Sequence, residues 1–349
     1  MERVASVLLA AASILACASC APGTSSAGET TSRISQFPLP LLKDADEDRW
    51  PGDIVAGRDG ALWFTELNGE RIGRIATAPL GQITEYTIPT RPAAAPSGGR
   101  RGGSPAEHID PRPGSIALGP DGALWFTVPN FNAIERITAS GHITEYPAGR
   151  DARPADIVAG SDGALWFTLP TTQQIGRITT AGRITRYPVP TANAAPQDIA
   201  LGPDGALWFT ERVGKKIGRI STSGQITEFP VRITQKKNGL FAIAPGPDRA
   251  LWFTEPDARK IGRITTTGTI TEYAVPQGYP TSITTGPDGA LWFSAILPSS
   301  VGRMTTAGTV EQYRLATNFD KPGAIAAGPD GALWFTVYTA DQIARIVPP

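Results

Sequence analysis

The stretch GPDGALWFTE, residues 202–211, contains the signals that decide the fold. Its Asp204-Gly205 dipeptide is preferred in two-residue hairpin turns, where both positions favour positive φ. The residues from 207 to 210 alternate as a strand after this turn, and the short apolar run 199–201 precedes it. We therefore expect two antiparallel strands joined at the Asp-Gly turn.

The same stretch recurs along the chain, and its Trp-Phe pair can be counted seven times. The pairs are spaced by 40 to 44 residues, except for a first interval of 62. Self-similarity at this period is typical of solenoids and propellers. The pairs begin at Trp63, Trp125, Trp166, Trp208, Trp252, Trp292 and Trp334.

The residues after each pair decide in favour of a propeller. In the fourth copy, 217–221 and 226–229 give a third and a fourth strand, and Pro230 then ends the pairing because proline has no N–H to donate. Four antiparallel strands per repeat make a propeller blade. The seventh copy lacks its fourth strand, and residues 34–37 resemble the missing piece. The predicted fold is therefore an all-β, seven-bladed propeller over 34–349, closed by its N-terminal strand, which removes open sheet edges.

The composition supports a soluble, well-packed domain. Of the 349 residues, 41% are hydrophobic and 18% are charged, which is enough apolar material for a sizeable core. Lysine plus arginine and aspartate plus glutamate number 32 each, so no general attraction to nucleic acid is indicated. We expect a monomer that binds a small molecule, a peptide or a glycan and touches a membrane only through a lipid anchor.

The first residues read as an export signal. The run 4–16 is apolar, follows Arg3 and is too short for a permanent membrane span. Residues 1–18 would then be a signal peptide and 19–33 a flexible tether. Either Cys17 or Cys20 is the lipid-bearing residue of a bacterial lipoprotein, or cleavage near Ala18 releases a secreted protein. No cysteine remains in the folded part, which excludes disulfides there.

One face of a propeller carries the loops from the fourth strand to the next first strand and from the second strand to the third, and ligands usually bind there. The long first interval places an insertion, residues 91–113, on this face. It contains His108 beside Glu107. It forms either a flap over the channel mouth or a tolerated surface loop.

Residues at the starts of the channel strands form a second candidate set. Asp53, Asp156 and Asp198 either hold a divalent cation through oxygen ligands or cap backbone N–H groups at the strand starts. The loops after the second strands add side chains to the rim. The predicted binding residues at the mouth are Asp53, Ser115, Asp156, Asp198, Ser282, Glu66, Glu211, Glu255 and Tyr338.

Features present in every repeat are expected to be structural. The Trp-Phe pairs should pack between blades. The repeated arginine of the Ile-Gly-Arg-Ile segment, for example Arg219, should pair across strands with glutamates such as Glu228. A site needs residues that break the repeat.

The run Pro-x-x-Ile-x-x-Gly-Pro-Asp-Gly-Ala-Leu-Trp-Phe-Thr-Glu, followed by Ile-Gly-Arg-Ile-Thr and Gly-x-Ile-Thr-Glu-Tyr-Pro, resembles the virginiamycin B lyase (streptogramin lyase) family over nearly the whole chain after residue 33. The resemblance implies a seven-bladed propeller and antibiotic resistance. The implied reaction linearises a cyclic depsipeptide by C–O elimination, with Mg²⁺ assistance. This chemistry needs a base for the α-proton and a cation for the developing enolate.

The family's base and metal site uses a histidine directly after the proline of a repeat, with a glutamate before that proline. Here the residues before the prolines include no glutamate. His108 is therefore the candidate base that remains, if the insertion folds inward. The sequence supports two functions: a C–O lyase with a rearranged site, or a cell-envelope binding or scaffold propeller without enzymatic activity. The residues directly after the prolines are Gly52, Gly114, Ala155, Gln197, Thr281 and Gly323.

Overall fold

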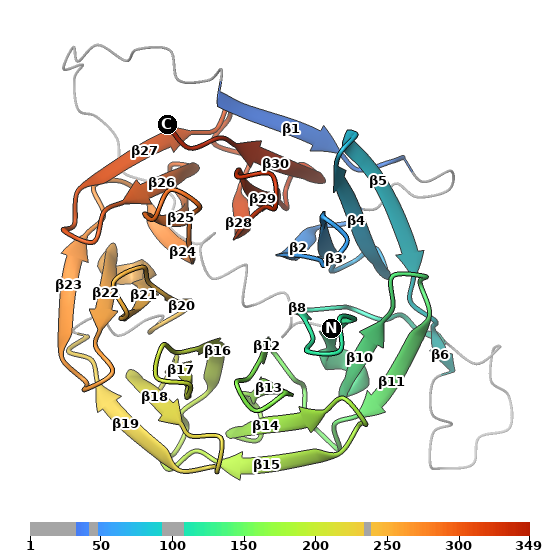
Figure 1. Cartoon of the computed structure of the whole chain (residues 1–349), viewed down its shortest axis with the longest axis horizontal. Helices are drawn as coiled ribbons and strands as arrows, with labels where there is room; N and C mark the ends of the chain where they lie inside the picture. The colour runs from blue at the N-terminus through green and yellow to red at the C-terminus, as the bar shows by residue number, and fades with distance from the viewer. Residues whose placement is uncertain (1–32, 42–47, 93–107, 234–238) are drawn as a thin grey trace, which may run out of the picture. The chain divides into compact units, whose positions relative to one another are not determined.

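The computed structural model describes residues 33–41, 48–92, 108–233 and 239–349. The chain divides into two units, 1–30 and 31–349, and all of these residues belong to the second. They form seven four-stranded antiparallel sheets around a central axis and one two-stranded ribbon, as Figure 1 shows. The predicted all-β, seven-bladed propeller is confirmed.

The strands occupy four concentric positions in the ring. The innermost strands are β2 (Pro51–Ala56), β8 (Ile116–Leu118), β12 (Ile157–Ala159), β16 (Pro196–Leu201), β20 (Ile243–Pro245), β24 (Tyr279–Thr285) and β28 (Pro322–Ala327). The second strands are β3 (Ala61–Glu66), β9 (Leu124–Val128), β13 (Ala164–Leu169), β17 (Leu207–Glu211), β21 (Leu251–Glu255), β25 (Leu291–Ile296) and β29 (Leu333–Val337).

The two outer positions complete each blade. The third strands are β4 (Arg71–Thr77), β10 (Ala133–Ile137), β14 (Gln174–Thr179), β18 (Lys216–Ile220), β22 (Lys260–Ile264), β26 (Ser300–Met304) and β30 (Gln342–Ile346). The outermost strands are β1 (Ile34–Pro38), β5 (Leu80–Thr87), β11 (Ile143–Pro147), β15 (Ile184–Pro188), β19 (Ile226–Pro230), β23 (Ile270–Ala274) and β27 (Val310–Arg314). The remaining elements are β6 (Arg91–Pro92), β7 (His108–Ile109) and two short 3₁₀ helices, η2 (Pro129–Phe131) and η3 (Pro256–Ala258).

The N-terminal strand closes the ring as predicted. β1 pairs antiparallel with β30 in the seventh blade, in a register that sets Ile34 opposite Ile346 and Pro38 opposite Gln342. In Figure 1 it is the outermost strand beside the last segment of the chain. The closure is therefore made by hydrogen bonds between the two ends of the domain.

The Trp-Phe pairs form the core between blades, which confirms their predicted role. The seven tryptophans of these pairs have no solvent exposure. The buried hydrophobic residues gather in seven clusters, each drawn from two neighbouring blades; Trp63 of the first blade, for example, packs on Phe126 of the second. Burial of this apolar surface, at about 25 cal/mol per Å², is the main attraction between blades.

The Asp-Gly turns differ from the predicted two-residue hairpins. Only the glycine has a positive φ, +77° at Gly205, while Asp204 does not. Gly205 donates its N–H to the carbonyl of Gly202, so a type I turn is followed by one left-handed residue. This geometry frees the aspartate side chain: Asp204 accepts from Trp208 Nε1 at 3.0 Å and from Arg219 Nε at 2.7 Å.

The repeated arginines therefore pair with aspartates and not with the predicted glutamates. In all seven blades the turn aspartate accepts hydrogen bonds from the tryptophan and the arginine of its own blade, with Arg–Asp distances of 2.6 to 2.7 Å. The register explains the error. Arg219 lies opposite Trp208 and on its side of the sheet, whereas Glu228 lies opposite Gly218 and points to the other side. Glu228 instead pairs with Lys216 at 2.8 Å.

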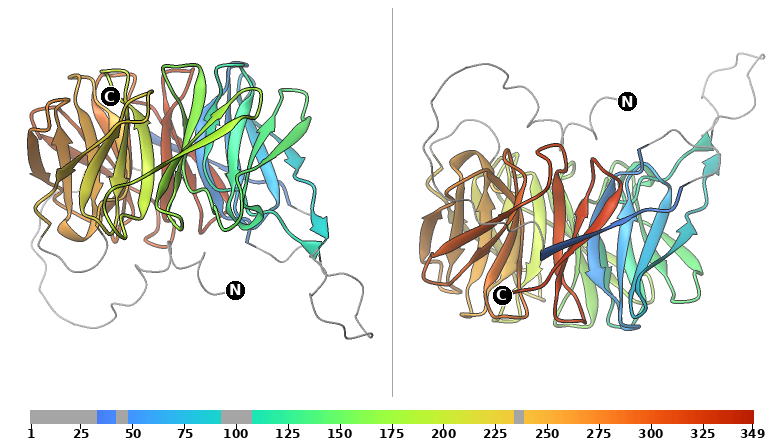
Figure 2. Two further views of the ribbon diagram at one scale, coloured as in Figure 1. Left: turned by 90° about the horizontal axis from the view of Figure 1, so that it is seen from below. Right: turned by 90° about the horizontal axis from the view of Figure 1, so that it is seen from above.

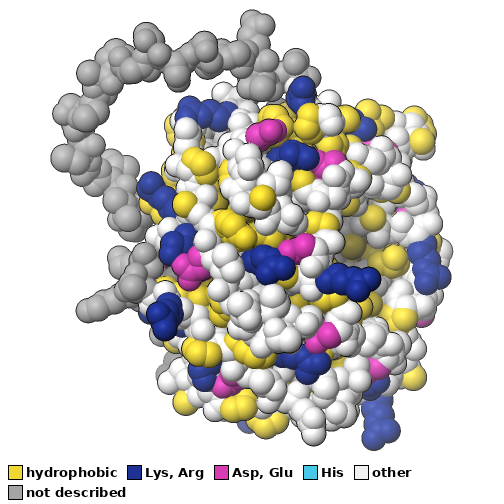
Figure 3. Space-filling model, turned by 60° about the vertical axis from the view of Figure 1, so that its left-hand side comes forward, with side chains coloured by type: hydrophobic (Ala, Val, Ile, Leu, Met, Phe, Trp, Pro, Cys, Tyr) yellow, Lys and Arg dark blue, Asp and Glu magenta, His cyan; other side chains and the backbone are white. Residues whose placement is uncertain are grey.

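The insertion begins as a ribbon at the edge of the ring. Arg91 of β6 pairs with Ile109 of β7, and Figure 2 shows the ribbon projecting outward. On the side of the molecule shown in Figure 3, basic and acidic side chains alternate without forming a patch of one sign. Within the described ranges, no helix has the length and apolarity needed to cross a membrane.

Candidate functional site

A ring of hydroxyl groups positions the start of each channel strand. Thr65 of β3 accepts the N–H of Asp53 at 3.0 Å and donates to the carbonyl of Gly114 in the next blade at 2.7 Å. Thr336 of the seventh blade likewise donates to the carbonyl of Gly52 in the first blade at 2.9 Å. The threonine of each Trp-Phe-Thr segment therefore links neighbouring blades beside the channel.

Four of the predicted channel residues lie in one continuous arc. Ser115 Oγ is 2.8 Å from Asp53 Oδ2 and 2.5 Å from Asp156 Oδ1. Asp156 and Asp198 both accept the N–H of Ile199, each at 2.7 Å. The structure thus brings Asp53, Ser115, Asp156 and Asp198 together across the first four blades.

These carboxylates cap backbone N–H groups of neighbouring blades, which is one of the two roles considered from the sequence. Asp53 accepts from Ile116 N–H at 2.9 Å, and Asp198 accepts from Ile243 N–H at 2.9 Å. The arc ends in the fifth blade because Ala242 has no carboxylate to continue it. Ser282, in the sixth blade, is consequently separate, and its N–H donates to Ser294 Oγ at 3.2 Å.

The arc contains too few donors for three ionised carboxylates. A serine hydroxyl has one proton, so Ser115 can donate to only one of its two neighbouring aspartates at a time. Burial and the charge of Asp156 raise the pKa of Asp53 to about 6, despite hydrogen bonds from Ile116 and Ser115 that lower it. Burial and Asp156 also raise the pKa of Asp198 well above its usual range. Asp53 and Asp198 therefore take up a proton at a higher pH than an exposed aspartate does.

The residues of the mouth do not fit the Mg²⁺ that the family resemblance implies. Among the described residues, no group of three or more His, Cys, Asp or Glu side chains is arranged to hold a metal ion. The oxygens of Asp53, Asp156 and Asp198 are occupied by N–H and O–H groups instead. The seventh blade also has an ammonium, Lys321, directly before its proline.

The three glutamates predicted at the rim are buried instead. Glu66 and Glu211 have no solvent exposure, and Glu255 has 2%. Side chains alternate along a strand, so Trp63 and Thr65 face the next blade while Phe64 and Glu66 face the previous one. The turn then covers the carboxyl group: a β-carbon on Gly69 would lie 2.4 Å from Glu66 Oε2.

Burial makes these glutamates weaker acids than exposed glutamates. It raises the pKa of Glu66 to about 8, with a further contribution from Glu85 and opposition from Arg49, whose Nη1 lies 3.4 Å from Glu66 Oε2. Burial, followed by the charges of Glu228 and Glu272, raises the pKa values of Glu211 and Glu255 to about 7. They belong to the seams between blades.

Glu135 is a further buried acid that sequence reasoning missed. It occupies the position of the glycine in the Ile-Gly-Arg-Ile segment, is 2% exposed, and has a pKa that burial raises to about 7. Near it, Arg91 forms an ion pair with Glu145 and lies 4.3 Å from the centre of the Phe131 ring. The break in the repeated segment was the available signal. Arg91 anchors the start of the insertion to the second blade.

The histidines offer no base at the channel mouth within the described side chains. His142 is exposed in the turn between β10 and β11, on the face that carries the Asp-Gly turns. His108 lies in β7, but its side chain is outside the described part of the structure, and so are Cys17 and Cys20. Tyr338 is half-buried at the mouth beside Gly323, as predicted, and burial raises its pKa to about 12.

The structure completes the set of residues in the position after the proline. In the fifth blade, which lacks the proline, Thr210 donates to the carbonyl of Phe241, and the equivalent threonines of other blades donate to Gly52, Gly114 and Ala155. Phe241 therefore occupies this position in the fifth blade. No blade places a histidine there.

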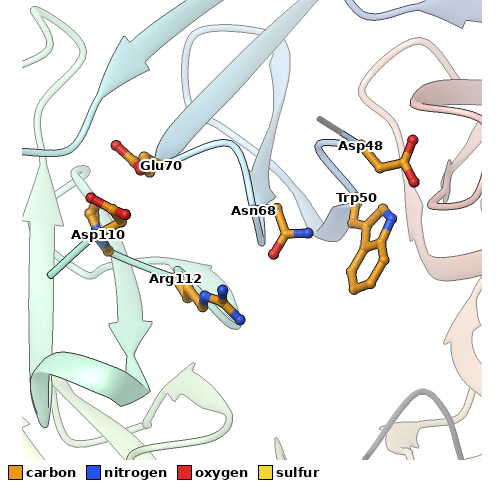
Figure 4. Close-up of a pocket in the computed structure, with 7 residues that line it drawn as sticks. Asp48, Trp50, Asn68, Glu70, Asp110 and Arg112 are labelled. Carbon is orange, nitrogen blue, oxygen red and sulfur yellow. The ribbon is translucent and has the colours of Figure 1, made fainter. Parts of the chain in front are cut away.

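A pocket of about 330 Å³ opens between the first two blades on the ligand face. Ligand sites in proteins commonly start at about 300 Å³. Figure 4 shows Glu70 and Asp110 on one side, Asp48 and Trp50 on the other, and Asn68 and Arg112 between them. The sequence signal for this site was Trp50, the tryptophan outside the seven Trp-Phe pairs.

The sheets and their order define the chain as a seven-bladed propeller. Residues 97–238 and 231–349 match the model of the virginiamycin B lyase family. The chain belongs to this family. The sequence has no match among curated proteins.

Solved structures agree with this assignment. A selenomethionine-substituted virginiamycin B lyase from Staphylococcus aureus is 34% identical, with a TM-score of 0.78, and the match covers 91% of this chain and 99% of that one. The same values hold for a catalytically inactive histidine-to-alanine variant of that enzyme with quinupristin. A streptogramin B lyase is 32% identical, with a TM-score of 0.76 and the same coverage. Hydrazine synthase from Kuenenia stuttgartiensis, 14% identical at a TM-score of 0.69, shares the fold alone.

Proposed function

We propose that this chain is a binding propeller of the virginiamycin B lyase family, which recognises a small molecule, peptide or glycan on its channel face without catalysing the family's elimination. The observation that carries this proposal is that no blade has a histidine at one position of its channel strand. In six blades this position directly follows the proline, and in the fifth blade it is occupied by Phe241. A proton beside a carbonyl is not removed without a positioned base.

The electrostatics of the mouth support the same proposal. A carboxylate acts as base or metal ligand only when it is ionised and accessible. Asp53, Asp156 and Asp198 are bound to N–H groups of the scaffold, and Glu66, Glu211 and Glu255 are buried in the seams. Their arrangement stabilises the ring and leaves none of these six carboxyl groups free to act as a base.

Lyase activity is the second candidate, supported by 34% identity over 91% of the chain. It would need His108 as the base. The two candidates are separated by incubating the protein with a streptogramin B and Mg²⁺ and following the substrate by chromatography and mass spectrometry. Elimination opens the ring at constant mass, whereas hydrolysis adds one water. We expect the substrate to remain cyclic; ring opening at constant mass that is abolished by His108→Ala would establish the lyase instead.

We also propose that the protein is exported and anchored by a lipid on Cys17 or Cys20, on the strength of the apolar run 4–16 and the small residues before each cysteine. Membrane fractionation of the full chain tests this. Cys17→Ser or Cys20→Ser should release the protein into the soluble fraction. Release of the unmodified chain would favour a secreted protein.

A further inference from the structure

Trp50 is set apart from every other tryptophan in the chain. The seven others are fully buried, and each donates its indole N–H to an aspartate of its own blade. Trp50 is partly exposed and lines the pocket between the first two blades (Figure 4). Its ring therefore serves no repeated packing role.

The backbone holds Trp50 in place from two blades. Its N–H donates to Asp341 Oδ1 of the seventh blade at 2.9 Å, and its carbonyl accepts from Leu67 N–H of the first blade at 3.0 Å. Its φ is +50°, a conformation that side-chain-bearing residues seldom adopt. These bonds fix the backbone from which the ring projects, so binding a ligand does not have to order this segment.

The charge of the pocket wall favours a cation. Three carboxylates, Asp48, Glu70 and Asp110, line it together with one guanidinium, Arg112. Asp48 and Asp110 alone exceed the charge of Arg112, and this excess of negative charge attracts cations and repels anions. The face of an indole ring also attracts a cation within about 6 Å of its centre. Both features select the same class of ligand.

We propose that this pocket binds an ammonium or guanidinium group carried by a small molecule or a peptide, with the cation over the Trp50 ring and attracted by the carboxylates of the pocket wall. A bare metal ion does not fit, since the described residues hold no group of three or more ligands arranged for one. The proposal rests on the proposed binding function and names the chemistry that the mouth recognises.

The test compares two probes of one shape by isothermal titration calorimetry: N-acetylarginine amide, which is cationic, and N-acetylcitrulline amide, which is neutral. We expect the arginine probe to bind and the citrulline probe to bind at least about tenfold more weakly. Loss of the cation–ring contact in Trp50→Leu should weaken the arginine probe by about 3- to 30-fold, while Trp50→Phe keeps most of the affinity. Asp110→Asn should also weaken it.

Asp320→Asn is the matched control, because Asp320 lies in a loop of the same face outside the pocket and its loss should leave the affinity unchanged. The melting temperature of each variant confirms folding. Equal binding of the two probes, absence of arginine binding, no effect of Trp50→Leu, or preferential binding of N-acetylglucosamine would each overturn the proposal. The streptogramin assay measures ring opening and does not depend on the arginine titration. Ring opening would contradict the proposed function, whereas a failed titration would contradict only this site.

Discussion

Replacing Glu66 by glutamine should remove a large part of the pH dependence of stability. The side chain has no solvent exposure, and burial raises its pKa from the ordinary 4.5 to about 8. The native state therefore holds this proton more tightly than the unfolded state does. Stability falls as pH rises through the window between these two values, because only the unfolded state releases the proton freely.

The magnitude follows from the two pKa values. A difference of one in pKa corresponds to about 1.4 kcal/mol, so Glu66 contributes a fall of about 5 kcal/mol over its whole titration, of which about 3–4 kcal/mol lies between pH 5 and 8. Glutamine has the same shape and cannot ionise. Arg49 keeps Glu85 as a partner, at 2.6 Å, so the variant should fold.

The assay is urea unfolding of the wild type and Glu66→Gln at pH 5 and pH 8. Other buried acids contribute equally in both proteins, so the difference between the two pH-dependent losses isolates Glu66. We expect this difference to be about 3–4 kcal/mol, with the variant less sensitive to pH. Glu311→Gln, an exposed position, is the control and should behave as the wild type. An equal loss of stability in Glu66→Gln and wild type would refute the reasoning.

Three further predictions concern the scaffold and are read from unfolding free energies. Arg249 has a φ of +59° where the other six turns have glycine. Arg249→Gly should therefore stabilise the protein by about 0.5–1 kcal/mol. A loss of stability in this variant would show that Arg249 is not strained. Asp204→Ala orphans the buried Trp208 indole N–H and should cost about 2–4 kcal/mol, whereas Asp204→Asn keeps an acceptor and should cost about half as much; equal costs would exclude the indole bond as the cause. Ser115→Ala should cost about 1–2 kcal/mol, and more at pH 8 than at pH 5, because the Asp53 carboxyl group, with a pKa of about 6, is then ionised without this donor; a pH-independent cost would argue against the raised pKa of Asp53.

The scaffold was largely predictable, since its determinants are local and repeated. The Asp-Gly turns, the Trp-Phe pairs and the strand at 34–37 gave the blade count, the core and the closure. The partners of the repeated arginines were not predictable in the same way. They depend on which side of the sheet each residue faces, and thus on the register, where a one-residue difference exchanges the sides.

The site was predicted only in part. Asp53, Asp156 and Asp198 were candidates for a cation site or for caps of the strand starts, and the sequence left open whether they meet. Their hydrogen bonds to the next blade depend on the geometry between blades. Glu66 follows the same alternation as Phe64, so its burial could have been deduced from the strand period. The pocket at Trp50 combines three segments far apart in the chain, and no local pattern specifies that combination.

The pairing of β1 with β30 has a consequence for how the ring comes into existence. The seventh blade is built from the first and last strands of the domain, so no order of synthesis completes it before the final strand is available. Six blades can pack as they emerge, but the circle stays open, with β2 lacking its neighbour β28. A chain truncated by one strand at either end loses the β1–β30 pair, so its seventh blade is incomplete. Moving the termini to a loop between two intact blades would make the closure covalent, and the difference in unfolding rate would measure how firmly the two ends hold the circle.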